Sequence, residues 1–176
     1  MESRAKIFGH PIHQMLIPFP LGLLGTAVIF DIIYLIWGNA TMVTVSYWMI
    51  VAGIIGALAA APFGLIDWLA IPSDTRANRV GMLHGIGNVI VLALFAISWY
   101  LRYSEQGPTP YVPTATALVL SFAGFALAGI TGWLGGELVD RLSVGVDNGA
   151  NLDAPSSLTG PVTKAGSKGP DLRRAA

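Results

Sequence analysis

Four long runs of apolar residues divide the chain, and short polar or glycine-containing links separate them. The runs cover residues 19–37, 43–71, 79–102 and 111–139. Each is about as long as a helix must be to cross a hydrocarbon core, on the order of 20 residues. None shows the two-residue alternation of a transmembrane barrel strand. Because a segment in lipid must satisfy its own backbone hydrogen bonds, the pattern predicts four transmembrane helices.

The links predict how these helices are arranged. Residues 38–42, 72–78 and 103–110 form short connections, which place consecutive helices antiparallel. We therefore expect an all-α, up-down-up-down four-helix bundle over residues 1–146. A short N-terminal segment, interrupted by Pro11, Pro18 and Pro20, is expected to lie along the membrane interface. From residue 147 to 176, Gly, Pro, Ser and Thr dominate and predict an irregular C-terminal tail.

Composition supports the membrane interpretation. Hydrophobic residues make up 53% of the 176 residues and charged residues only 11%, whereas soluble domains carry about a quarter charged residues. The formal net charge is zero, so no basic surface for nucleic acid is expected. The chain has no cysteine, which excludes disulfides and thiolate metal sites. No cleavage motif precedes the first run, so we expect it to be retained in the membrane rather than removed as a signal peptide.

Positive charges predict the orientation of the bundle. Five of them lie near the helix ends on the N-terminal face, namely Arg4, Lys6, Arg76, Arg79 and Arg141. The opposite face has Arg102. Because Lys and Arg accumulate on the cytoplasmic side, we expect a multi-pass inner-membrane protein with both termini in the cytoplasm. Aromatic residues are expected to form a belt on the outer side, namely Tyr34, Trp37, Tyr47, Trp48, Trp99, Tyr100, Tyr103 and Tyr111.

Two features suggest how the helices associate. The fourth run carries a small residue at every fourth position, which predicts a helix-packing face formed by Gly124, Ala128, Gly132 and Gly136. Asp31 lies in the outer half of the first run, where an unpaired carboxylate is costly. Arg102 is long enough to reach it from the third run, so we predict a structural ion pair. A proton-handling role for Asp31 is the alternative.

Polar residues should meet at the cytoplasmic end of the bundle. His10 and His13 precede the first span, Asp67 ends the second, His84 opens the third and Glu137 closes the fourth. Alternating traverses of the membrane bring these ends to one level, although they are distant in the sequence. Gly81 and Gly85 flank His84 on its helix, which leaves room for a close backbone or a flat ligand.

This cluster has three interpretations. In the first, the cluster is a hydrogen-bonded network that ties the helix ends together. In the second, it is a b-type haem site, with His84 and His13 as axial ligands, His10 as the substitute and Asp67 or Glu137 orienting an imidazole. In the third, it is a divalent-metal site formed by His10, His13, His84 and Asp67, a ligand set suited to zinc, iron or manganese.

Several segments resemble one known family. They are "GHPIHQMLIPFPLGLLGTAVIFD", "AAAPFGLIDWLAIP", "HGIGN" and "GWLGGELVDRLSVGV", which span residues 9–146. In this order they resemble the bacterial four-helix membrane family catalogued as domain of unknown function 2231. Family members commonly read His-Pro twice at the start, whereas Gln14 follows His13 here, and many have an aromatic residue in place of Asp140. The resemblance implies a small inner-membrane protein and, through relatives near Rieske-type iron–sulfur domains, redox surroundings.

These patterns favour a non-catalytic membrane subunit with a redox role through bound haem. The alternative is a structural or scaffolding subunit in which the glycine face and the tail contact other membrane proteins. An enzyme is less supported, because no nucleophile–base pair or phosphate-binding loop is present in the sequence. The expected contacts are the lipid bilayer and other membrane subunits.

Overall fold

The computed structural model describes residues 1–104, 109–160 and 162 and has an all-α architecture. Four helices in this part of the chain are long and apolar enough to cross a membrane, over Ile12–Trp37, Ala40–Leu69, Arg76–Ser104 and Ala115–Arg141. The four transmembrane helices expected from the apolar runs are confirmed. Many of their large apolar side chains are exposed on the outside of the bundle, as lipid contact requires.

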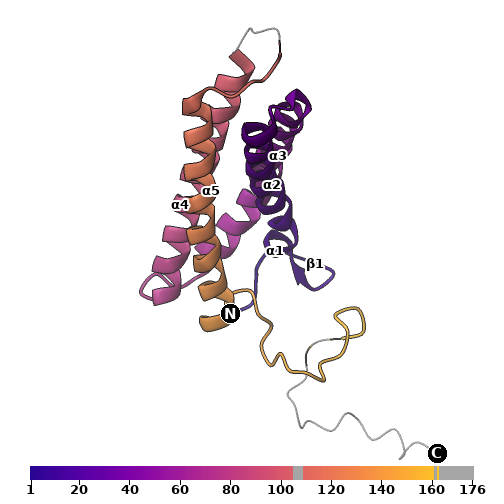
Figure 1. The fold of residues 1–176 in the computed structure, drawn as a ribbon. Helices are drawn as coiled ribbons and strands as arrows, with labels where there is room; N and C mark the ends of the chain where they lie inside the picture. Colours follow the sequence, from indigo (N-terminus) through magenta and orange to yellow (C-terminus); the bar gives the residue numbers. More distant parts are fainter. Residues whose placement is uncertain (105–108, 161, 163–176) are drawn as a thin grey trace, which may run out of the picture.

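The helices form two hairpins that lie side by side (Figure 1). The first consists of α2 (Pro18–Trp37) and α3 (Ala40–Leu69), and the second of α4 (Arg76–Ser104) and α5 (Ala115–Gly136). Contacts within each hairpin are the most extensive, and α3 with α4 and α2 with α5 join the hairpins. This is the expected up-down-up-down bundle.

Residues at the helix ends explain the tight turns. Gly38 ends α2 in the left-handed conformation, at φ 67°, and donates its N–H to the carbonyl of Tyr34. Asn39 caps α3 by accepting from the N–H of Thr41. Thr114 caps α5 in the same way through Ala117. The fourth helix therefore begins at Ala115, later than the apolar run indicated.

The N-terminal segment forms a small hairpin that the sequence did not suggest. Strands β1 (Lys6–Ile7) and β2 (His10–Pro11) pair antiparallel and lead into the short helix α1 (Ile12–Leu16). α1 is joined to α2 through Ile17, whose backbone is helical. Pro18 stands at the first turn of α2, where its missing N–H is not needed.

The described part of the C-terminal tail lies against this N-terminal segment (Figure 1). A π-helical turn, η1 (Glu137–Arg141), ends the fourth span. Beyond it, the N–H of Gly145 donates to the carbonyl of Met1, and the N–H of Asn148 donates to the carboxylate of Glu2. Residues that precede the first span and follow the fourth therefore form one layer at the same end of the bundle.

The core between the hairpins changes in character along the bundle. Its central part consists of buried apolar side chains from α2, α3 and α4, with Leu24, Ile50, Val91 and Phe95 among them, and partly buried side chains of α5 pack against them. Towards the α2–α3 turn the core becomes polar and contains a buried ion pair. Towards the terminal end it contains two histidines.

Candidate functional site

His13 lies in α1 and reaches the backbone of α3. Its Nδ1 lies 3.0 Å from the carbonyl oxygen of Ala60. Since a carbonyl can only accept, Nδ1 carries the proton, and Nε2 of the neutral ring keeps a lone pair. The ring lies against Gly64, one turn further along α3, where a Cβ would be 2.8 Å from the Cε1 of His13. Glycine at this position makes room for the imidazole.

His84 has the same arrangement in the second hairpin. Its Nδ1 donates to the carbonyl oxygen of Thr131 on α5, at 2.8 Å. Its Cε1 faces Gly135, one turn after Thr131, where a Cβ would be 3.2 Å away. The side-chain amide of Asn88 lies 3.1 Å from Nε2 and also donates to the carbonyl of His84. The Oγ1 of Thr131 donates to Asn88 Oδ1 at 3.0 Å and thereby orients the amide.

The imidazoles of His13 and His84 lie opposite each other, one from each half of the bundle. Their ring centroids are 6.4 Å apart and their planes are nearly perpendicular, at 85°. Each Nδ1 is used by a backbone carbonyl of the neighbouring helix. The remaining ring nitrogens are acceptors in a largely apolar bundle. Two imidazoles whose centroids are 6.4 Å apart are suited to bind a metal centre or to share a proton.

The other polar residues expected at this site are engaged elsewhere. Asp67 accepts from the Oγ of Ser3 and from the N–H groups of Arg4 and Ala5. Glu137 accepts from Arg76 at 2.7 Å. Neither carboxylate orients an imidazole, so this part of the predicted site is wrong. Backbone carbonyls take that role.

His10 is separated from the imidazole pair. It is exposed, and its Nε2 lies 3.3 Å from the Oγ of Ser157 in the tail. In the part of the chain that the structure describes, no group of three or more His, Asp or Glu side chains could hold a metal ion. The four-residue metal set of His10, His13, His84 and Asp67 is therefore not brought together.

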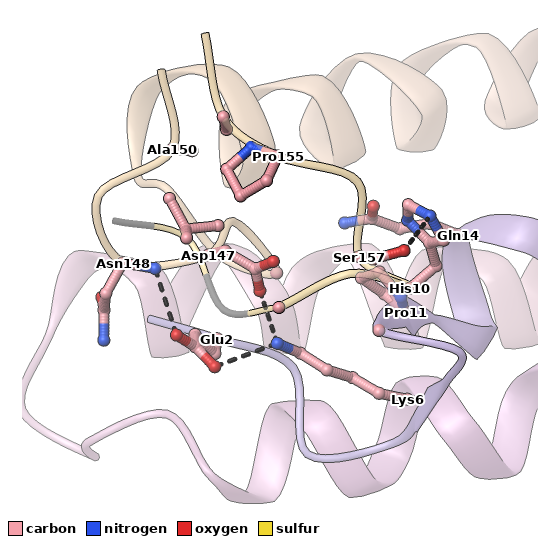
Figure 2. A pocket seen from close by; sticks show the side chains of 15 residues that line it. Glu2, Lys6, His10, Pro11, Gln14, Asp147, Asn148, Ala150, Pro155 and Ser157 are labelled. Atoms are coloured by element: carbon pink, nitrogen blue, oxygen red, sulfur yellow. Dashed lines mark hydrogen bonds and ion pairs between the residues drawn. The ribbon is translucent and has the colours of Figure 1, made fainter. Parts of the chain in front are cut away.

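A half-open pocket of about 570 Å³ lies where the tail meets the N-terminal segment. Figure 2 shows its charged centre, in which Lys6 lies between Glu2 and Asp147. Hydrogen bonds from Lys6 and Asn148 lower the pKa of Glu2. Hydrogen bonds to Asp147 and Glu2 raise the pKa of Lys6. Both shifts stabilise the charged forms, so the pocket is a junction that fastens the tail.

The predicted ion pair is present at the other end of the core. Arg102 Nη1 and Nη2 donate to the two carboxylate oxygens of Asp31 at 2.8 and 2.6 Å, and both side chains are 0% exposed. Three buried serines complete the coordination of the guanidinium, namely Ser46, Ser98 and Ser121. All these groups are satisfied within the protein, which favours the structural role predicted for Asp31.

The small-residue face of α5 only partly packs as expected. A Cβ at Gly124 would be 2.9 Å from Phe95, so this position lies at a close helix contact. At Gly132 and Gly136 no atom of the described residues lies within 4 Å of such a Cβ. Gly135 contacts His84 instead. The flanking glycines of His84 also differ: Trp68 fills the space at Gly81, whereas the space at Gly85 is open.

Comparison with known proteins gives one match. A family model described as "Predicted membrane protein (DUF2231)" covers residues 9–148. That range includes all three histidines, both members of the buried ion pair and all four long helices. No curated protein and no solved structure matches the chain.

Proposed function

The chain belongs to the DUF2231 family of predicted membrane proteins, and we propose that it is a non-catalytic membrane subunit that holds b-type haem between His13 and His84. The observation that carries the proposal is the pair of opposed imidazoles. His13 and His84 would hold the haem iron through their Nε2 atoms, because a backbone carbonyl engages each Nδ1. The centroid separation of 6.4 Å is compatible with this arrangement.

The hydrogen bonds of the imidazoles also support a ligand role. Ligating histidines usually donate their second N–H to a carbonyl or carboxylate, which fixes the tautomer and raises the basicity of the ligating nitrogen. Ala60 and Thr131 supply such carbonyls from two different helices. The ring of each histidine is further restrained by a glycine surface, at Gly64 and Gly135.

Bound haem would supply one-electron transfer, and the chain's own residues would set its environment. The apolar helices around the pair would lower the local dielectric. His10 is not required, because the tail engages it. We propose that the site lies near the cytoplasmic surface of a bacterial inner membrane, since Arg4, Lys6 and Arg79 lie at the same end of the bundle. Electron donors and acceptors would be other membrane subunits.

A structural role is the second candidate, and Asn88 favours it. Its amide lies 3.1 Å from the Nε2 of His84, so it fills the position that a metal would take. In this alternative, the imidazoles connect α1 to α3 and α4 to α5 and bind nothing. Haem binding requires the Asn88 side chain to turn away from Nε2.

A reduced-minus-oxidised visible spectrum of the purified protein separates the two candidates. The haem proposal predicts a b-type difference signal that His13→Ala and His84→Ala each abolish. His10→Ala is the matched control and should keep the full signal, and Asn88→Ala should keep it as well. A flat spectrum from haem-replete cells, with well-folded protein, would contradict haem binding and leave the structural role.

A further inference from the structure

Residues 71 positions apart have the same role in the two halves of the bundle. Asp31 and Arg102 are separated by 71 residues and form the buried ion pair. His13 and His84 have the same separation and form the imidazole pair. The carbonyl that accepts from each histidine lies 47 residues further along the chain, on α3 for His13 and on α5 for His84.

Helix packing shows the same relationship. A Cβ at Gly53 would lie 2.6 Å from Leu24, on the partner helix of the first hairpin. Shifting both residues by 71 gives Gly124 and Phe95, and a Cβ at Gly124 would lie 2.9 Å from Phe95. The close contact between the two helices is thus made at the same position in both hairpins.

Burial follows the shift as well. The buried residues of α5 are Ala117, Ser121, Gly124 and Thr131. Their counterparts in α3 are also buried, namely Ser46, Ile50, Gly53 and Ala60. In α2 and α4, three counterpart pairs are buried together: Leu24 with Phe95, Ala27 with Ser98, and Asp31 with Arg102. Residue types are seldom kept, whereas the place in the core is.

The connections between the helices complete the correspondence. A shift of 71 residues superimposes α2 on α4 and α3 on α5, so the contact of α3 with α4 corresponds to that of α2 with α5. When two equivalent units pack about a two-fold axis, a residue can touch its own counterpart only near that axis. The imidazole pair and the ion pair therefore mark two points on the axis, one near each end of the bundle.

We propose that the chain is a tandem repeat of two equivalent helical hairpins related by a pseudo-two-fold axis along the bundle, and that Asp31 and Arg102 direct the unlike hairpins to pair. Pairing of like hairpins would bring two carboxylates or two guanidinium groups together in the membrane core, which is strongly unfavourable. The inference does not depend on haem. The surface of the first hairpin, which carries Asp31, is thus specific for the surface of the second hairpin, which carries Arg102.

The first test transposes charges in the full chain and follows thermal unfolding in detergent. Asp31→Arg and Arg102→Asp each place like charges on the axis, and each should lower the Tm by at least about 8 °C. The double variant should recover most of that loss. Reversal of the Arg76–Glu137 pair, whose members are 61 residues apart and whose arginine is exposed, is the control and should lower the Tm less than either single charge reversal.

The neighbours of the ion pair make this test specific for a repeat. Ser98 and Ser121 contact Arg102, and their counterparts are Ala27 and Ile50. The exchange of A27S, S98A, I50S and S121I should lower the Tm in the native background. In the charge-reversed background it should raise the Tm, because the hydroxyl groups then follow the guanidinium to its new position. A lower Tm in both backgrounds would overturn the proposal.

Cross-linking in the native background decides the question if the charge-reversed chain does not fold. A Cβ at Gly25 on α2 would lie 3.1 Å from Phe125 on α5, and the repeat predicts an equivalent contact between Ala96 and Ile54. Because the chain has no cysteine, G25C/F125C and I54C/A96C should both be joined by a short bifunctional thiol reagent. The control I54C/I97C should not. Cross-linking of the first pair without the second would overturn the repeat.

Discussion

Asp31 and Arg102 form a two-pronged ion pair in which neither side chain is exposed. The pair lies within the membrane-spanning part of the bundle, on helices that are not neighbours along the chain. Its burial means that each charge depends on the other, since no water replaces a lost partner. This ion pair joins the two helical hairpins at one end, and at the other end the imidazoles of His13 and His84 lie opposite each other.

Removal of one charge should therefore be far worse than removal of both. Asp31→Ala leaves an uncompensated buried guanidinium and should cost about 3–5 kcal/mol. The double variant D31L/R102L should retain more stability than the single variant, because no buried charge remains. Chemical unfolding in detergent measures both. A single variant that unfolds like the native protein would contradict the burial of the pair.

The glycines that support the imidazoles should not tolerate a side chain. Gly64→Ala places a methyl group 2.8 Å from the Cε1 of His13 and should cost about 1–3 kcal/mol. Gly135→Ala should cost less, because its contact to His84 is 3.2 Å. Gly132→Ala is the control, since a Cβ there meets nothing within 4 Å. Thermal unfolding measures the order, and equal effects at all three positions would contradict it.

The junction between the tail and the N-terminal segment should loosen in acid. The pKa of Glu2 is lowered from 4.5 in the folded protein, so its stabilising effect is present above pH 4.5 and is lost as the pH falls through the lowered pKa. The protection factors of residues 145–150, which correct hydrogen-exchange rates for the intrinsic effect of pH, should fall over that range. The Glu2→Gln variant should already show the lower protection factors of residues 145–150 at neutral pH. Protection factors in the native chain that stay unchanged while Glu2 becomes protonated would contradict this role of Glu2.

The helices and the meeting of two histidines could be predicted from the sequence for a simple physical reason. Four apolar runs with short links allow one alternating traverse, and His13 and His84 stand at corresponding ends. Asp67 could not be placed in this way, because its partners include the backbone N–H groups of Arg4 and Ala5. Such groups occur in every residue and leave no pattern in a sequence.

The internal repeat also escaped the sequence pattern. Its halves keep the position in the core rather than the residue type, so that Leu24 corresponds to Phe95 and Asp31 to Arg102. Identical residues recur at few places, among them His13 with His84 and Gly64 with Gly135. A constant spacing of 71 residues between counterparts is the sign of this repeat. It is recognised in the structure from the ion pair and the imidazole pair.

The opposition of His13 and His84 is tested most directly by solid-state NMR of haem-free protein in bilayers. The chain has three histidines, so selective ¹³C and ¹⁵N labelling of histidine gives a simple spectrum. We predict a through-space correlation between two imidazoles, both protonated at Nδ1, that His13→Ala removes and His10→Ala keeps. The absence of that correlation, or protonation at Nε2 in either ring, would contradict the arrangement on which the proposed function rests.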